Sequence, residues 1–466
     1  MKILIRGGEV VTADARRKAD VLVDGETIAA VGEDLAAWAD RVLDARGRYV
    51  LPGGVDAHTH FELAFGGVVS SDDFETGTIA ALHGGTTTVI DFAVPEPGAT
   101  LRSGYEAWRA KADGRTAVDY GLHVILRDGS EAHLAEMDEL VREGVTSFKL
   151  FMAYPGVYLL DDGAIFRALQ RARANGSLIT VHAENGHVIE ELRRQALAAG
   201  RTEPIHHALT RPPQTEGEAT GRAILLAELA GAPVYIVHLT AAPALAHVRE
   251  ARARGLRAYA ETCPQYLFLT EDCYREPGFD GAKYVMSPPL RPRGHQEELW
   301  RGLADGTLQV VGTDHCPFCM HAGFAGLPAQ KERGIGDFTQ IPNGVPGVET
   351  RLVLLHDGGV RAGRFPLERL VDVCCTAPAR IFGLYPRKGT IAVGSDADLV
   401  VFDPNRRLSL SAAALHMRVD YSPYEGREVT GAPSAVLARG EVVVEDGKYL
   451  GRKGRGRFLR RGAPMV

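Results

Sequence analysis

The chain has 466 residues, of which 45% are hydrophobic and 24% are charged, a balance typical of a large globular protein with one or two domains. A formal net charge of −6 gives no reason to expect nucleic-acid binding through a basic surface. The N-terminus becomes polar too early for a signal peptide, and no apolar run is long enough to span a membrane. Six cysteines in such a long chain do not predict a disulfide framework. We therefore expect a cytoplasmic protein with reduced thiols.

Both ends of the chain carry a β-strand pattern. Residues 1–51 alternate apolar and polar positions and are interrupted by Gly-containing turns such as Asp24-Gly25. Residues 386–450 repeat this pattern, beginning with GTIAVGSDADLVVFDP. Because the ends of a chain commonly lie close together, the two segments predict one small β-sandwich. The basic residues 451–466 then form a C-terminal arm, which is either solvated or in contact with another subunit.

The middle of the chain, residues 52–385, repeats a different unit: an amphipathic helix, a glycine stop and a short apolar strand. The five clearest helix and strand pairs are 72–83 with 86–92, 131–143 with 146–151, 164–174 with 177–182, 216–230 with 233–238, and 297–304 with 308–314. Alternating helices and strands predict an α/β fold with parallel strands, and in this length a TIM (β/α)8 barrel. An open doubly wound sheet is the alternative, but no G-x-G-x-x-G fingerprint follows the first strand.

The ends of the predicted strands carry potential metal ligands. They are His58 and His60 in VDAHTH, followed by Lys149, His182, His238 and Asp314. With 16 histidines in 466 residues, roughly half an H-x-H pair is expected by chance, and a single histidine in an apolar strand is more often a hydrogen-bonded core residue. Four histidines and an aspartate at the same end of parallel strands instead predict a metal site, for which imidazole and carboxylate suit Zn²⁺. Residue chemistry alone does not explain a lysine beside cations.

Longer motifs cover essentially the whole chain. They are VDAHTH, SFKLFMAY, TVHAEN, YIVHLT, ETCPQYL, MSPPLR, GTDHCPF, IPNG and KGTIAVGSDADLVVFDP. In this order they closely resemble the dihydropyrimidinase and hydantoinase family, which are cyclic amidases of the amidohydrolase superfamily. The resemblance implies a metal-dependent hydrolase that opens 5,6-dihydropyrimidines and 5-substituted hydantoins to N-carbamoyl amino acids.

The resemblance also assigns the metal ligands. Lys149 is expected to react with CO₂ and become N6-carboxylysine, which turns a cation into a bridging carboxylate. His58, His60 and Asp314 would hold one divalent ion, and His182 and His238 the other. Zn²⁺ is the expected metal, with Mn²⁺ or Co²⁺ as alternatives. A hydroxide between two such ions is a recurrent hydrolytic design, because cations lower the pKa of water.

Further roles follow from the same resemblance. Asp314 would act as general base and then general acid, and the Tyr154 hydroxyl would stabilise the oxyanion. Main-chain atoms at Ser287 and Asn343 would bind the imide of the ring. We expect the exocyclic substituent to meet an apolar wall, although packing at the barrel mouth is an equal interpretation for these side chains. The candidates for the wall are Leu63, Phe65, Phe151 and Tyr158.

Some features depart from the family pattern. Ala64 and Pro155-Gly156 stand where family members often carry Pro and Lys, and residues 319–329 form a longer segment that we expect to act as an altered lid. The identity of the small-molecule substrate therefore stays open. By resemblance, we expect a homotetramer, because relatives of this kind usually form one. No nucleic-acid or membrane partner is expected.

Three alternative functions remain at this stage. Dihydroorotases share the metal arrangement, but typically place an arginine after the H-x-H pair, where this chain has Phe61-Glu62, and an acid there would repel a carboxylate substrate. Allantoinase is disfavoured only by the SPPLR and IPNG motifs. A non-catalytic scaffold related to dihydropyrimidinase is disfavoured because all six ligand positions are retained.

Overall fold

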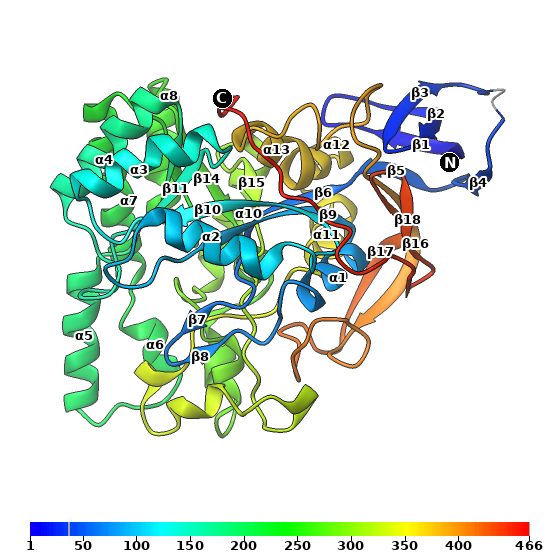
Figure 1. Ribbon diagram of the computed structural model, residues 1–466. Coiled ribbons are helices and arrows are strands. Elements are labelled where there is room, and N and C mark those ends of the chain that lie inside the picture. Colours follow the sequence, from blue (N-terminus) through cyan, green and yellow to red (C-terminus); the bar gives the residue numbers. More distant parts are fainter. Residues whose placement is uncertain (36–37, 466) are drawn as a thin grey trace.

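The computed structural model describes residues 1–35 and 38–465, and its centre is a barrel of parallel strands (Figure 1). The strands are β6 (Gly54–Thr59), β9 (Thr86–Ala93), β10 (Asp119–Ile125), β11 (Ser147–Phe151), β12 (Leu178–His182), β13 (Val234–Ile236), β14 (Ala258–Thr262) and β15 (Val310–Val311). They pair in the order β15-β14-β13-β12-β11-β10-β9-β6, so neighbours in the sequence are also neighbours in the sheet. The TIM-barrel prediction is confirmed, and the open doubly wound sheet is excluded by this strand order.

The barrel closes between its first strand and the segment that follows its last strand. The Asp314 amide donates to the His58 carbonyl over 2.9 Å, and the His60 amide donates to the His315 carbonyl over 2.9 Å. A parallel bridge between Thr59 and His315 lies between these two bonds. Closure therefore places the H-x-H pair directly beside the aspartate, although more than half the chain separates them.

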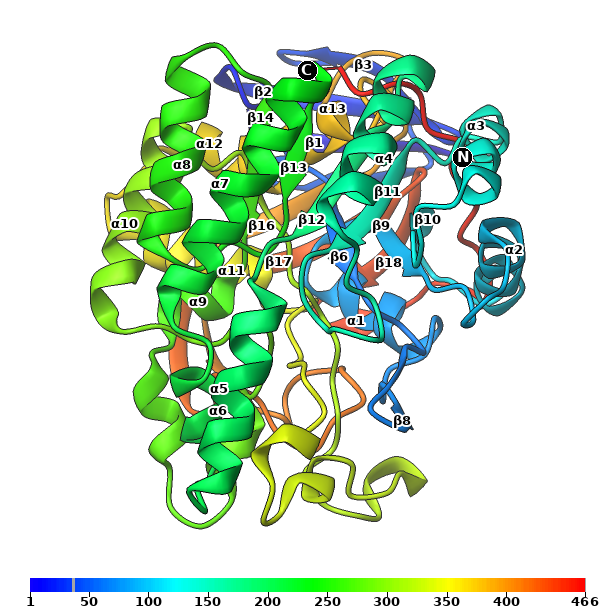
Figure 2. The same cartoon turned by 90° about the vertical axis from the view of Figure 1, so that its left-hand side faces the viewer.

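Helices surround the barrel and bury one face each (Figure 2). The longer ones are α1 (Thr76–His83), α2 (Leu101–Ala112), α3 (Glu131–Arg142), α4 (Asp162–Asn175), α5 (Gly186–Ala198), α7 (Pro213–Ala230), α8 (Ala242–Ala253) and α10 (Arg293–Asp305). In α4 the Asp161 side chain caps the first turn by accepting from the Ala164 amide, and Gly176 ends the helix at φ 76°. Its buried residues share one face, at the spacing expected of an amphipathic helix.

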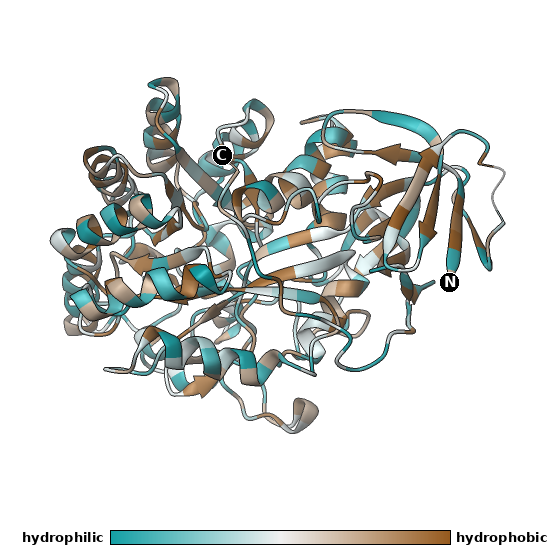
Figure 3. Ribbon diagram, turned by 45° about the horizontal axis from the view of Figure 1, so that its top comes forward, coloured by the Kyte–Doolittle hydropathy of each residue, from teal (hydrophilic) through white to brown (hydrophobic). Residues whose placement is uncertain are grey.

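Short helices lie between these units or follow the last strand. They are α6 (Ile205–Leu209), α9 (Pro264–Phe268), α11 (Arg351–Leu355), α12 (Leu367–Val371) and α13 (Ala377–Ile381). Figure 3 shows apolar residues concentrated along the barrel strands, while the outer helices carry many hydrophilic positions. The strand β9, for example, is buried along its whole length, as expected for a parallel strand covered on both faces.

Strands from both ends of the chain form one mixed sheet of nine strands. They are β1 (Lys2–Val11), β2 (Arg16–Asp24), β3 (Thr27–Gly32), β4 (Arg41–Asp44), β5 (Tyr49–Pro52), β16 (Leu399–Leu410), β17 (Arg427–Ala438), β18 (Glu441–Glu445) and β19 (Lys448–Tyr449). The two halves join where β5 pairs with β16. Side chains from both halves, including Ile5, Val21 and Leu399, share one hydrophobic cluster. The prediction that the two ends build one β-rich unit is confirmed.

A buried ionic network fastens this sheet to the barrel. The Lys388 ammonium lies 2.7 Å from carboxylate oxygens of both Asp119 on β10 and Asp398. The Arg439 guanidinium contacts Asp119 over 3.0 Å. Burial opposes the charge on Lys388, but the three nearby aspartates raise its pKa above the ordinary value. A buried charge is tolerated when it is paired in this way.

The C-terminal arm packs on the barrel of its own chain (Figure 1). The Tyr120 amide donates to the Arg457 carbonyl, and the Leu459 amide donates to the Tyr120 carbonyl over 2.7 Å. The Leu459 side chain is fully buried. This part of the arm is therefore not solvated, contrary to one of the two expectations, and the homotetramer stays a prediction. Within the described residues, none of the helices combines the length and apolarity needed to cross a membrane.

Candidate metal centre and active site

A cavity of about 70 Å³ opens at the carboxyl ends of the barrel strands. Every site residue predicted from the sequence lines it: His58, His60, Lys149, His182, His238 and Asp314, together with Leu63, Phe65, Phe151, Tyr154, Tyr158, Ser287 and Asn343. These residues come from strand ends and the loops after them, which is where barrel enzymes place their chemistry. Their individual roles stay predictions.

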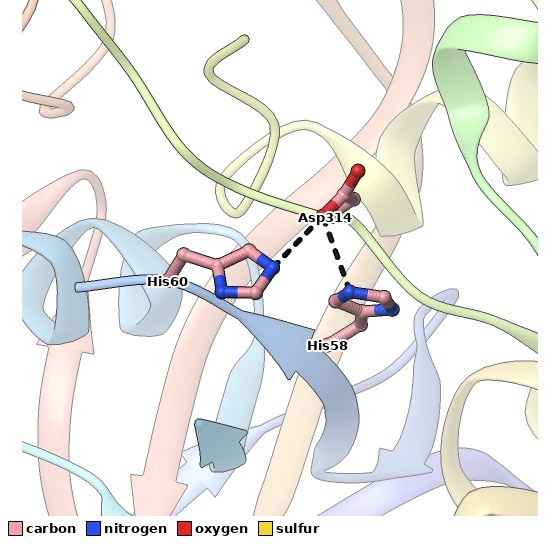
Figure 4. Close-up of side chains that lie close together, drawn as sticks. All are labelled: His58, His60 and Asp314. Carbon is pink, nitrogen blue, oxygen red and sulfur yellow. Dashed lines mark ion pairs between the residues drawn. The ribbon is translucent and has the colours of Figure 1, made fainter. Parts of the chain in front are cut away.

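His58, His60 and Asp314 form the tightest group of ligands (Figure 4). The Nε2 atoms of the two imidazoles lie 3.2 and 3.1 Å from the same carboxylate oxygen of Asp314, and all three ligand atoms are within 4.8 Å of one another. The Nδ1 atom of His58 contacts Glu261, which leaves Nε2 to face the cavity. That buried nitrogen has no hydrogen-bond partner among the described residues. A carboxylate behind a histidine is a common support of metal ligands.

The charges in this group suit a cation. Burial opposes ionisation of Asp314, but the nearby His58 and His60 imidazoles outweigh it, so the pKa of Asp314 lies well below its usual range. Burial lowers the pKa of His60 to about 4. Burial also opposes protonation of His58, but Glu261 and Asp314 raise the pKa of His58 to about 9. A cation at this Nε2 would replace that proton, so metal binding is expected to release it.

Lys149, His182 and His238 face the first group across the cavity. The rings of the two histidines are 4.6 Å apart, and the His182 Nε2 atom lies 2.7 Å from Glu184, which leaves Nδ1 as the available ligand atom. The buried Nδ1 of His238 has no hydrogen-bond partner in the described part of the chain. Within that same part, no third His, Cys, Asp or Glu ligand atom lies close enough to complete this pair.

Lys149 itself is almost completely buried. Its ammonium nitrogen lies 5.0 and 5.1 Å from the ring centroids of Phe92 and Phe151. Burial lowers the pKa of Lys149 to about 8, even though Asp314 and Glu261 act in the opposite direction. An appreciable fraction of the side chain is then neutral near pH 7, and the neutral amine is the nucleophilic form.

The backbone is strained at three of the residues that line the cavity. Tyr154, His238 and Asp314 have φ values of 62°, 38° and 53°, a left-handed conformation that residues other than glycine rarely adopt. Each such residue costs on the order of 1–3 kcal/mol, and such strain concentrates at functional sites. The strained backbone therefore coincides with residues whose side chains line the cavity.

Polar and aromatic side chains form the rest of the cavity lining. The Asn343 amide donates to the Ser287 hydroxyl over 3.1 Å. Burial raises the pKa of Tyr154, so its hydroxyl keeps its proton and remains a hydrogen-bond donor at neutral pH. The rings of Phe151 and Tyr158 stack with centroids 5.0 Å apart. The hairpin of β7 (Ala64–Phe65) and β8 (Val68–Val69) adds Phe65 to this lining.

Two supporting carboxylates escaped the sequence analysis. Glu261, near the end of β14, is the first residue of the motif ETCPQYL and contacts His58, while Glu184 follows His182 by two residues and contacts it. The signal for Glu261 was its place as the first residue of the motif ETCPQYL. The signal for Glu184 was the i, i+2 spacing, which places two side chains on the same face of an extended segment.

One expectation needs correction, and a second stays a prediction. Glu62 does not face the cavity, because its carboxylate pairs with Arg115 over 2.5 Å, so it cannot repel a carboxylate substrate there. Residues 319–329 do not line the cavity either. The amides of Met320 and His321 instead bond to Asp420 over 2.9 and 2.7 Å, which ties this segment to the C-terminal half and gives no support to a lid.

Comparisons with known proteins identify the class to which the chain belongs. The sequence model described as the amidohydrolase family matches residues 49–443, which defines the class of protein. D-hydantoinase of Streptomyces coelicolor is 54% identical over 465 residues, 99% of this chain and 98% of the relative. D-hydantoinase of Geobacillus stearothermophilus is 50% identical over 462 residues, 99% of this chain and 97% of that protein.

Solved structures show the same similarity. The crystal structure of dihydropyrimidinase from Brevibacillus agri has a TM-score of 0.97 at 50% identity and covers 99% of both chains. L-hydantoinase (dihydropyrimidinase) from Arthrobacter aurescens has a TM-score of 0.88 at 34% identity, covering 98% of this chain and 99% of that one. The chain belongs to the D-hydantoinase and dihydropyrimidinase family of the amidohydrolases.

Proposed function

We propose that this protein hydrolyses the ring amide of 5-substituted hydantoins and 5,6-dihydropyrimidines to N-carbamoyl amino acids, using two divalent cations. The observation that carries the proposal is the convergence of four imidazoles, one carboxylate and one buried lysine on a single cavity. Relatives at 50% identity or more bear the name D-hydantoinase, which supports the hydantoin class and a preference for the D configuration.

The donor set fits such a cation pair. His58, His60 and Asp314 would hold one ion and His182 and His238 the other, with Lys149 as the shared ligand. The lysine amine would add to CO₂ through a new N–C bond and lose a proton, which gives a carbamate with two ligand oxygens. When bound, the ions would supply an activated water and polarise the ring carbonyl. Zn²⁺ suits these imidazole and carboxylate ligands, and Mn²⁺ or Co²⁺ would also fit.

The remaining chemistry falls to side chains of the chain itself. Asp314 would accept the proton of the attacking water and return it to the ring nitrogen as the C–N bond breaks, because an amide nitrogen leaves poorly without that proton. The Tyr154 hydroxyl, which stays protonated, would donate to the oxyanion that forms on the carbonyl. Backbone groups at Ser287 and Asn343 would orient the imide of the ring.

The cavity wall favours neutral substrates with apolar substituents. Leu63, Phe65, Phe151 and Tyr158 present hydrophobic surface where a 5-substituent would lie. Among the described residues no arginine lines this cavity, and Arg193 and Arg211 line only the adjoining pocket, so inside the cavity a dihydroorotate carboxylate would lack a guanidinium partner. The lack of an arginine in the cavity, and not the position of Glu62, is the reason to prefer hydantoins and dihydropyrimidines over dihydroorotate.

A side-by-side steady-state assay tests the function. We expect the highest kcat/KM with D-5-phenylhydantoin or another apolar 5-substituted hydantoin, lower values with dihydrouracil, and no significant turnover of dihydroorotate or allantoin. The L enantiomer should be the poorer substrate. If the metal-loaded protein turned over allantoin or dihydroorotate better than every hydantoin and dihydropyrimidine, the substrate assignment would be wrong. No turnover of any ring would revive the scaffold interpretation.

The role of Tyr154 is tested by Tyr154→Phe, which removes one hydroxyl and keeps the ring. We expect kcat to fall by about 10²- to 10³-fold, the usual cost of losing one oxyanion donor, with a much smaller change in KM. The matched control is Tyr158→Phe, whose ring also lines the cavity. Equal effects of the two substitutions on kcat would remove the oxyanion role from Tyr154.

A further inference from the structure

A second cluster of ligand-type side chains lies outside the catalytic cavity. His83 is the last residue of α1, Glu349 precedes α11, and His416 lies in the long connection between β16 and β17. One ligand atom of each lies within 4.8 Å of the other two. None of the three lines the catalytic cavity, and the proposed function leaves them without a role.

Contacts inside the cluster are close but incomplete. The Nδ1 atom of His416 lies 2.8 Å from one oxygen of Glu349, and the His416 amide donates to the other oxygen over 2.6 Å. The rings of His83 and His416 stack with centroids 3.4 Å apart. The Nε2 atom of His83 is buried and has no hydrogen-bond partner among the described residues. A buried nitrogen without a partner loses the hydrogen bonds that it would make to water, so the geometry calls for a partner.

The cluster also has room for an additional ligand. The three side chains line a cavity of about 130 Å³, which is open enough to admit water. Two imidazoles and one carboxylate, with a fourth position left to water, form a common zinc ligand set. We propose that His83, Glu349 and His416 bind a Zn²⁺ ion, or a similar divalent cation, at a site separate from the catalytic centre. The stacked rings must turn apart for both lone pairs to reach one ion, which requires the partly exposed His416 to give up its present Nδ1 contact with Glu349.

Binding here would connect segments that are far apart in the chain. The ion would join the barrel helix α1 to the connection that contains His416. The same connection contacts Asp72, whose carboxylate accepts from the Arg418 amide over 3.0 Å. Asp72 also lies 3.1 Å from the His315 ring, next to Asp314. A peripheral ion is therefore expected to stabilise the packing of the C-terminal half against the barrel, because a ligand that binds only the folded state raises stability.

Zinc stoichiometry tests the site in the metal-loaded enzyme. The chain and its His83→Ala, Glu349→Gln and His416→Ala variants are dialysed against the same buffered free Zn²⁺, and bound zinc is measured by mass spectrometry. His247→Ala is the matched control, because His247 is an exposed histidine that belongs to no ligand cluster in the described residues. We expect the unchanged chain and the control to bind one zinc per chain more than the three variants. The affinity for this extra ion should weaken by at least about 10-fold in each variant, because replacing even a supporting residue of a metal site typically weakens metal binding by that factor.

Hydantoin turnover and thermal unfolding complete the test. Turnover should be the same in all five proteins, which shows that the variants are folded and that the catalytic ions are in place. Added Zn²⁺ should raise the Tm of the unchanged chain and the control, but not of the variants. Equal zinc stoichiometry and affinity across all five proteins would overturn the proposal. Because the readouts are bound metal and Tm, a failure here is distinct from a failure of the proposed catalytic function.

Discussion

Replacing Asp314 with asparagine should lower kcat by about 10²- to 10⁴-fold, the range expected when a general acid and base is removed, while metal content stays near normal. The amide oxygen can still act as a ligand, but it cannot take up a proton. Asp314 contacts both His58 and His60, and its low pKa keeps the carboxylate ionised, which is the form that a general base requires. Metal analysis and steady-state kinetics on the same preparation measure both effects.

Asp72→Asn is the control for a general disturbance of this region. Asp72 is buried and contacts His315, but it does not line the cavity. We expect its substitution to affect stability more than kcat. Near-normal turnover by the Asp314→Asn protein would remove the proton-transfer role, and loss of its metal would show that Asp314 acts mainly as a ligand.

Replacing Lys149 with alanine should abolish activity and remove most of the bound metal. The histidine pair on that side of the cavity has no other ligand to complete it among the described residues, so His182 and His238 alone should hold an ion weakly. Because the proposed ligand is a carbamate, small carboxylic acids such as acetate or propionate should restore part of the activity by occupying the space of the missing side chain. Metal content and rate are measured across a series of acid concentrations.

Lys331 offers a matched control for this rescue. It is also fully buried, and burial lowers its pKa to about 7. Its ammonium group donates to the carbonyls of Val285, Pro342 and Gly344 over 2.8–3.0 Å, a purely structural arrangement. Lys331→Met should lose activity through displacement of the Asn343 loop and should not respond to carboxylic acids. A Lys149→Ala protein that keeps its metal and ignores carboxylic acids would argue against the carbamate.

Much of the fold was accessible from local sequence patterns. Helix-period and strand-period apolar spacing with glycine stops predicted the repeating units, because amphipathic spacing shows which face each element buries. The observed α4 (Asp162–Asn175) and β12 (Leu178–His182) differ from the predicted 164–174 and 177–182 by two residues at most. The bounds of the short strand β15 (Val310–Val311) were harder to predict, because only 2 residues form a regular strand there.

The types of residue at the site were also determined by the sequence. Ligands at the ends of predicted parallel strands must meet at one rim of a barrel. The sequence alone therefore predicts that His58, His182 and His238 converge. The resemblance to a known family added the role of Lys149, which charge arguments alone disfavoured. Together these two sources named every cavity residue that the proposed function uses.

Only the tertiary structure decided where individual side chains point and what supports them. Glu62 follows the H-x-H pair in sequence but turns away to Arg115, and Glu261 reaches His58 across 203 positions of the chain. The left-handed backbone at His238 and Asp314, and the meeting of His83 with His416, likewise leave no local signal. Local spacing determines which face an element buries, whereas these contacts depend on the closure of the barrel and the packing of segments far apart in sequence.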